Sequence, residues 1–346
     1  MKKILILPFL LFILCVPVSA SEITAPPVPN SGMALMPEET ESFADGLWSL
    51  FKNAVSLINP DLAEAAKTCR GILAAVLMVS LIQQFPGGEH QAVVLCGTVM
   101  TAAMLLSNTH SLISLGVNTI GDLSEYGKLL LPVMTSALAA QGGITGSAAL
   151  YAGTTAFDMV LCTLIDRLLV PGVYLFLAMA TASSALGEDI LNKITAFIKW
   201  LITWSLKILL YIFTGYIGIT GVVSGTTDAA ALKAAKLTIS GVVPVVGGIL
   251  SDASEAVLVS AGLVKNAAGI YGIFAILAVF MGPFLKIGSH YLILKGTGAV
   301  CGMLGCKQIT DLIGNFSSAM GLLLAMTGSV CLLLLISTVC FLKGVG

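Results

Sequence analysis

Residues 319–342 of the chain read AMGLLLAMTGSVCLLLLISTVCFL. These 24 residues contain no Asp, Glu, Lys, Arg or His. A transmembrane helix needs about 20 consecutive, mainly apolar residues, and a segment in lipid must satisfy its backbone hydrogen bonds internally, as a helix does. The stretch therefore predicts a membrane-spanning helix, and the rest of the chain should be compatible with the same solvent.

The composition extends this prediction to the whole chain. Of its 346 residues, 57% are hydrophobic and 10% are charged, and the mean hydropathy is +1.00, whereas an ordinary soluble domain is about 25% charged. Such a chain cannot cover a soluble globule with charged side chains, and it is too apolar to be disordered. Its net charge of −1 excludes a nucleic-acid binder, which needs a basic surplus. We predict an all-α polytopic membrane protein, a helical bundle in the lipid bilayer.

No catalytic or cofactor motif accompanies this composition. The sequence contains no Walker loop, no HExxH and no GxSxG motif, and its three histidines are scattered. The eight cysteines include no CxxC pair, which favours small apolar side chains in helices over a redox or metal role. We therefore expect no enzymatic activity, no cofactor and no metal site.

The first twenty residues have the organisation of an export signal. Lys2 and Lys3 form a positive region, and residues 4–18 are apolar. Val18-Ser19-Ala20 then provides small residues at positions −3 and −1 for cleavage before Ser21. An uncleaved anchor is the alternative, although the apolar run is short for a span. We assign residues 1–20 to a signal peptide and expect the mature chain to begin at Ser21.

Residues 21–67 are predicted to be extracytoplasmic. The first part is a polar lead-in rich in proline, which should not be forced into a fold. After it, apolar residues recur at helical spacing beside Trp48, namely Phe43, Leu47, Leu50, Phe51 and Val55. This pattern predicts an amphipathic helix on the outer membrane face, or one that packs on the helix bundle itself.

Residues 68–128 predict a membrane hairpin followed by an interfacial segment. The apolar runs 71–85 and 93–106 flank a polar turn at 86–90, and each is short for a span. Residues 108–128 are polar enough to lie at the interface. Further apolar stretches follow at about 129–157, 159–186, 208–224, 239–250, 268–285, 287–305 and 319–342.

The spacing of prolines suggests an internal repeat. Two pairs are each separated by 39 residues and are offset by 112, namely Pro132 with Pro171 and Pro244 with Pro283. With six inserted residues, Gly187 then aligns with Gly305. We predict two related membrane units, within 129–224 and 225–346.

Each unit contains a short apolar arm that is interrupted by polar residues and glycines. The interruptions predict re-entrant or broken helices, which at membrane depth occur only where they are buried in protein or line a watery cavity. Ordinary interfacial loops are the alternative. We take as candidate conduit or partner site the residues Gln141, Gly142, Gly143, Pro244, Gly247, Gly248, Asp252 and Glu255.

The stretch 251–255 allows two interpretations. Asp252 and Glu255 share one helix face and could line a water-filled path or meet a partner subunit. Alternatively, Ser251 caps a helix that begins there, and the acidic residues are favoured near its positive end.

Ionisable residues within apolar stretches are functional candidates, because their burial in lipid is costly. Asp158 is one of them. Asp166 and Arg167 are neighbours in sequence and favour a span boundary, while Lys286 and His290 favour a helix end at the interface after Pro283.

A second polar pattern lies on one helix face. A stripe at four-residue spacing, Thr195-Lys199-Thr203-Lys207, is flanked by Trp200 and Trp204. It predicts an amphipathic helix at the headgroup level. The alternative is a stripe that lines a pore.

One segment carries a family resemblance. Residues 240–258 read SGVVPVVGGILSDASEAVL, followed by Lys265-Asn266-Ala267 and Gly269. This segment resembles the hallmark of the stage III sporulation protein AE family of endospore-forming bacteria. The resemblance continues through the order of signal peptide, polar lead-in and polytopic core. The chain is shorter than typical members after its signal, which puts extracytoplasmic contacts made there in doubt.

The resemblance implies a multi-pass protein of the mother-cell membrane surrounding the forespore. It implies a subunit of the channel or secretion-like complex between the two cells, with other membrane subunits as partners. A permease-like conduit formed by the chain itself is the finer form of this expectation. An autonomous secondary transporter of a small solute and a structural membrane scaffold are the alternatives. No catalytic residues come with the family.

Overall fold

The computed structural model describes residues 25–37, 42–83, 90–141, 143–187, 189–242 and 247–343. Side chains at 220–242 and 247–262 and at a few other helical positions lie outside that description. Every regular element of the described part is helical: α2 (Asn30–Met33), α3 (Phe43–Gln83), α4 (His90–Ala140), α5 (Ile144–Leu164), the π-helix η1 (Ile165–Leu169), α6 (Val170–Leu186), α7 (Asp189–Val242), α8 (Gly247–Met303) and α9 (Lys307–Lys343). The predicted all-α fold is confirmed.

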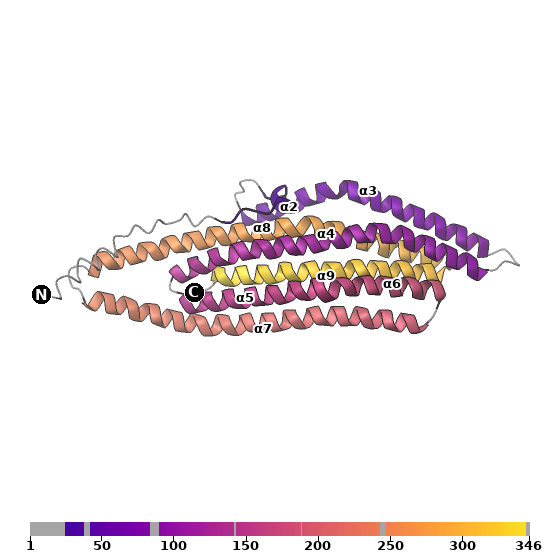
Figure 1. Ribbon diagram of the computed structural model, residues 1–346. Coiled ribbons are helices and arrows are strands. Elements are labelled where there is room, and N and C mark those ends of the chain that lie inside the picture. The colour runs from indigo at the N-terminus through magenta and orange to yellow at the C-terminus, as the bar shows by residue number, and fades with distance from the viewer. Residues whose placement is uncertain are drawn as a thin grey trace.

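The long helices run side by side along one axis (Figure 1). α9 lies in the middle, between α4 on one side and α5 and α6 on the other, while α7 and α3 lie at opposite edges. Of the apolar stretch of α9, 61% is buried, against 17% in α7. The uncharged run at residues 319–342 therefore lies at the core of the bundle.

Six of the described helical stretches are long and apolar enough to cross a membrane. Several helices are much longer than a bilayer requires. The 57 residues of α8 extend about 85 Å at 1.5 Å per residue, whereas the hydrocarbon core is about 30 Å thick. The protein is therefore a multi-pass bundle whose longest helices continue beyond the hydrocarbon core.

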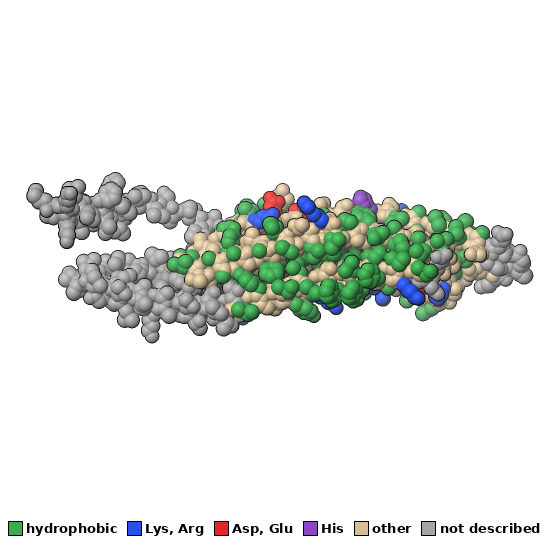
Figure 2. Space-filling view, turned by 60° about the horizontal axis from the view of Figure 1, so that its bottom comes forward, with side chains coloured by type: hydrophobic (Ala, Val, Ile, Leu, Met, Phe, Trp, Pro, Cys, Tyr) green, Lys and Arg blue, Asp and Glu red, His purple; other side chains and the backbone are tan. Residues whose placement is uncertain are grey.

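The surface agrees with a lipid environment. Figure 2 shows hydrophobic side chains over much of the visible face, with charged side chains in a few places. Large apolar side chains point outward on most helices, including Met78, Tyr211 and Ile219. In water this surface would be an aggregation liability, and in a bilayer it is the expected boundary.

α3 packs on the bundle, which was one of the two interpretations of its amphipathic pattern. Leu50 and Ala54 are fully buried, and they form a small apolar cluster with Phe274 and Ala278 of α8. The rings of Phe43 and Phe274 lie 5.0 Å apart. Trp48 remains exposed on the outer side.

α4 runs as one helix through the segment for which an interfacial position was expected. Residues 108–128 belong to it, so the expected boundary at 128/129 falls inside a continuous helix. The polar positions of this segment are accommodated along a long rod that has Leu123 and Tyr126 buried against the core. Spacing alone could not show this, because polar residues on one face do not end a helix.

The prolines are tolerated within or beside long helices. Pro283 lies inside α8, so the helix end expected near Lys286 and His290 is wrong. Pro171 follows the π-helix η1. A proline ring has no amide hydrogen and clashes with the carbonyl four residues earlier, here that of Arg167, and the wider π-turn relieves this clash.

Two glycines occupy matching places in the proposed repeat. Gly187 ends α6 with φ of 72°, and Gly305 follows α8 with φ of 83°. The left-handed conformation costs a residue with a Cβ roughly 1–2 kcal/mol, so glycine suits both corners. Pro244 lies outside the described residues, and Pro132 lies inside α4. The duplication of whole units thus stays a prediction, supported at its carboxyl-terminal corners.

Candidate functional site

At the first predicted break, the structure has a short turn that joins the antiparallel helices α4 and α5, as the alternative of an ordinary loop expected. α4 ends at Ala140 and α5 begins at Ile144. The amides of Gln141 and Gly143 both donate to the carbonyl of Leu138, at 3.1 and 3.2 Å. The side-chain oxygen of Gln141 is buried without a hydrogen-bond partner among the described residues. Gly142 lies outside the described residues.

The second predicted break is not at 251–255. α8 is helical without interruption from Gly247, through Asp252 and Glu255. Ser251 therefore does not cap the start of this helix, because the helix begins four residues earlier. The two glycines Gly247 and Gly248 form its first turn, and the side chains of this stretch lie outside the description.

The fold does not bring the two candidate clusters together. A Cβ on Gly269 of α8 would meet Met134 of α4, which aligns the two helices there. Gly247 lies 22 residues before Gly269, about 33 Å along the axis, whereas Gln141 lies seven residues after Met134, about 10 Å. The end of α8 accordingly projects beyond the α4–α5 turn (Figure 1).

A buried polar stripe on α5 is the most notable chemical feature of the described interior. Thr154, Asp158 and Cys162 follow one another at four-residue spacing on one face. The hydroxyl of Ser124 on α4 donates to Asp158 Oδ2 at 2.6 Å, and the Cys162 thiol lies 3.7 Å from Oδ1. One turn earlier, Thr154 is hydrogen-bonded to Ser337 of α9 at 2.8 Å.

This stripe places a carboxyl group between three helices. Asp158 is 5% exposed, and burying a charge without partners is expensive. Ser124 and Cys162 satisfy only part of the hydrogen-bonding capacity of a carboxylate. A group of this kind can hold a proton or attract a cation, and it is a functional candidate by default inside a membrane protein.

The sequence indicated Asp158 but not its partners. Ser124 is 34 residues away, and the pair Thr154–Ser337 is separated by 183 residues. Single hydroxyl residues in apolar helices are common, so only the packing identifies them. Among the described residues, no group of three His, Cys, Asp or Glu side chains could hold a metal ion.

The polar stripe predicted on α7 reaches the central helix. Lys199 Nζ donates to Ser318 Oγ of α9 at 3.0 Å. Beside it, a polar pocket of about 640 Å³ opens between α7, α8 and α9, with Lys295 and Asp311 in its lining. Trp200 and Trp204 are exposed and stacked, with ring centroids 5.6 Å apart. The tryptophans face outward, as in a membrane belt, while Lys199 points to the bundle.

Comparison with known proteins gives one consistent result. A family model described as stage III sporulation protein AE matches residues 42–344. The stage III sporulation protein AE of Bacillus subtilis (strain 168) is 24% identical over 235 residues, which cover 68% of this chain and 59% of that protein. The match thus spans less than two thirds of that relative. No solved structure matches the chain.

Proposed function

Because the chain belongs to the stage III sporulation protein AE family, we propose that it is a membrane subunit of the channel complex joining the mother cell and the forespore. The observation that carries the proposal is the extent of the match. It runs from residue 42 to residue 344 and so includes α3 to α9 with all six candidate spans. The whole bundle, and not one shared helix, is what this chain has in common with the family.

The proposed location is the mother-cell membrane that surrounds the forespore, and the proposed partners are other membrane subunits of the complex. The shape of the bundle supports this role. Helices such as α8 are far longer than one hydrocarbon core, so they offer surface outside the bilayer. Subunits on either side of the membrane could dock on such surface.

A permease-like conduit is the finer form of the proposal. Its support is the polar interior, where Asp158, Ser124 and the Thr154–Ser337 pair lie between α4, α5 and α9. Polar side chains inside a membrane protein commonly mark a substrate or ion path. The π-helix η1, which begins three residues after Cys162, adds irregular backbone near this stripe.

An autonomous secondary transporter is the second candidate. The π-helix η1 inside the helical stretch 144–186 favours it, because transporters place irregular or broken helices at their binding sites. The two functions differ in what the isolated protein can do. A transporter moves its solute alone, whereas a channel subunit needs its complex.

Affinity purification from sporulating cells tests the proposal. A tagged chain, solubilised in mild detergent, should bring down the same set of membrane proteins from sporulating cells, and none of that set when it is expressed in growing cells. Purification as a lone protein from sporulating cells would contradict the proposal. In liposomes, the isolated protein should show no solute flux, and saturable flux without partners would favour the transporter.

A further inference from the structure

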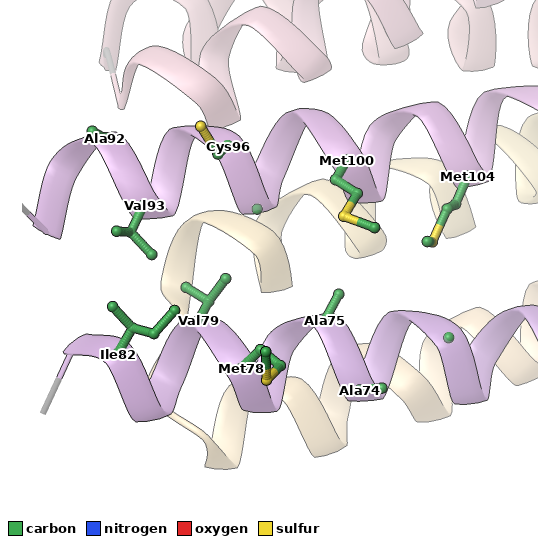
Figure 3. Close-up of a pocket in the computed structure, with 12 residues that line it drawn as sticks. Ala74, Ala75, Met78, Val79, Ile82, Ala92, Val93, Cys96, Met100 and Met104 are labelled. Atoms are coloured by element: carbon green, nitrogen blue, oxygen red, sulfur yellow. The ribbon is translucent and has the colours of Figure 1, made fainter.

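An apolar groove lies between α3 and α4 on the outer surface of the bundle (Figure 3). It has a volume of about 600 Å³. Side chains of both helices face it, and all of them are apolar: Ala74, Ala75, Met78, Val79, Ile82, Ala92, Val93, Cys96, Met100 and Met104, with Gly71 and Gly97. Gly97 lies against Val79, so the two helices approach closely at its floor.

The groove becomes polar at one end. Asn108 Nδ2 of α4 donates to Thr68 Oγ1 of α3 at 3.0 Å, which places these two positions opposite each other. Lys67 precedes Gly71 by one turn on the same helix face. Ser107 and Ser111 continue the face of Met104 on α4 by the same spacing, and all three of these polar residues are exposed.

Two positive charges gather at this end. Arg70 is exposed and adjoins Gly71, and Lys67 is exposed one turn before it. An apolar channel that terminates at cations and hydroxyls is chemically matched to an amphiphile with a negative head.

We propose that the groove binds one acyl chain of an anionic phospholipid, whose phosphate lies at Lys67 and Arg70. From Gly71 to Ile82 the groove is about 16 Å long at 1.5 Å per residue. Flexible methionine side chains adapt to an irregular apolar occupant, and basic residues at this level attract anionic lipid.

The cationic end of the groove favours an anionic lipid over a partner helix. The surrounding surface is lipid-facing, since Leu77, Leu81 and Val99 beside the groove are exposed. The proposal does not depend on the proposed function, because it concerns only α3, α4 and the bilayer.

Lipid titration of the full chain tests the proposal. The purified protein is delipidated in detergent and titrated with phosphatidylglycerol or with phosphatidylcholine of the same acyl chains, and bound lipid is measured by native mass spectrometry. The wild type should prefer phosphatidylglycerol by about tenfold. The Lys67→Ala/Arg70→Ala variant should lose this preference, and Ala74→Phe, which fills the groove, should lose tight binding of both lipids.

A matched control is available outside the groove. Lys52 of α3 and Lys193 of α7 are exposed cations that do not line it, so Lys52→Ala/Lys193→Ala should retain the preference of the wild type. A Lys67→Ala/Arg70→Ala variant that binds phosphatidylglycerol as the wild type does would overturn the headgroup assignment. Equal loss in both double variants would also overturn it, because the charge effect would then be non-specific.

Cys96 supplies a readout in the unaltered protein. It lies in the groove and is the exposed thiol among the described cysteines. Phosphatidylglycerol should slow its alkylation by N-ethylmaleimide several-fold, and phosphatidylcholine at the same concentration should do so less. Alkylation that no lipid slows would refute the site. Protection by a co-purified protein in the absence of bound lipid would assign the groove to a partner helix instead.

Discussion

At the scale of single residues, Asp158 places an ionisable carboxyl group at a buried position of the bundle. Its carboxyl group is buried between α4, α5 and α9, and its shortest hydrogen bond comes from Ser124. A hydrophobic residue would pack there at lower cost. The structural role of the carboxyl group and its functional role can be separated by substitution.

Asp158→Asn should preserve the fold and impair function. The amide oxygen can still accept from Ser124, so the protein should reach the membrane in normal amounts, while loss of the ionisable group should lower spore yield at least tenfold. Ser124→Ala removes the donor instead and should cost about 1–3 kcal/mol of stability. Immunoblots of membrane fractions, spore counts and thermal unfolding measure these effects. Normal spore yield with Asp158→Asn would show that the carboxyl group has a structural role only.

Asp252 and Glu255 remain candidates of a different kind. With Ser251 inside α8, the capping interpretation of this stretch no longer applies. We expect the double variant Asp252→Asn/Glu255→Gln to block sporulation after engulfment. The amount of protein in the membrane should stay normal, because the two substitutions remove charge and change little else. Microscopy of sporulating cells and immunoblotting provide the test. Wild-type spore numbers from the double variant would remove both residues from the candidate site.

At the scale of elements, the ends of the helices are set by glycine, not by proline. α4 and α8 continue through Pro132 and Pro283, whereas Gly187 and Gly305 turn the chain with positive φ. In lipid, backbone groups freed by a proline are satisfied by neighbouring helices and side chains. A left-handed corner has no such remedy for a residue with a Cβ.

Gly305→Ala should destabilise the protein by roughly 1–2 kcal/mol. No heavy atom lies within 4 Å of its Cβ position, so the cost is one of backbone conformation alone. Gly288→Ala is the matched control, because that glycine is helical and equally open, and alanine there should be neutral or slightly stabilising. Thermal unfolding in detergent measures both. Equal melting temperatures for the two variants would show that the corner tolerates a side chain.

At the scale of the whole molecule, α9 is the element around which the other helices assemble. It packs against α8, α4, α6, α7 and α5. Because lipid tails are as apolar as leucine, close packing and not removal from water holds such helices together. Leu334 is an example, since a Cβ on Gly127 of α4 would meet it at 2.7 Å.

Leu334→Ala should therefore be far more costly than Leu332→Ala. Leu334 is 1% exposed and Leu332 is 50% exposed. The cavity left at Leu334 should cost about 2–4 kcal/mol, while the outward position should lose less than about 0.5 kcal/mol. Thermal unfolding of the two purified variants gives the comparison. Similar losses at both positions would contradict the central place of α9.

Several properties follow from the sequence alone. The low charge and the uncharged run at 319–342 determine the solvent, and the solvent requires helices, because backbone groups in lipid must be paired within their own segment. The turn at 141–143 is readable from local sequence, since two glycines follow an apolar helix there. The family is readable from the segment at 240–258, and the match over residues 42–344 confirms it.

Only the tertiary structure decides which helices are continuous and which polar residues meet. Residues 108–128 and 251–255 lie inside the long helices α4 and α8, because a few polar residues do not by themselves end a helix. Asp158 meets Ser124 because α4 and α5 are antiparallel neighbours, and the groove at Gly71 and Gly97 exists because α3 and α4 pack closely there. Local spacing carries no information on such contacts, which depend on where distant helices lie.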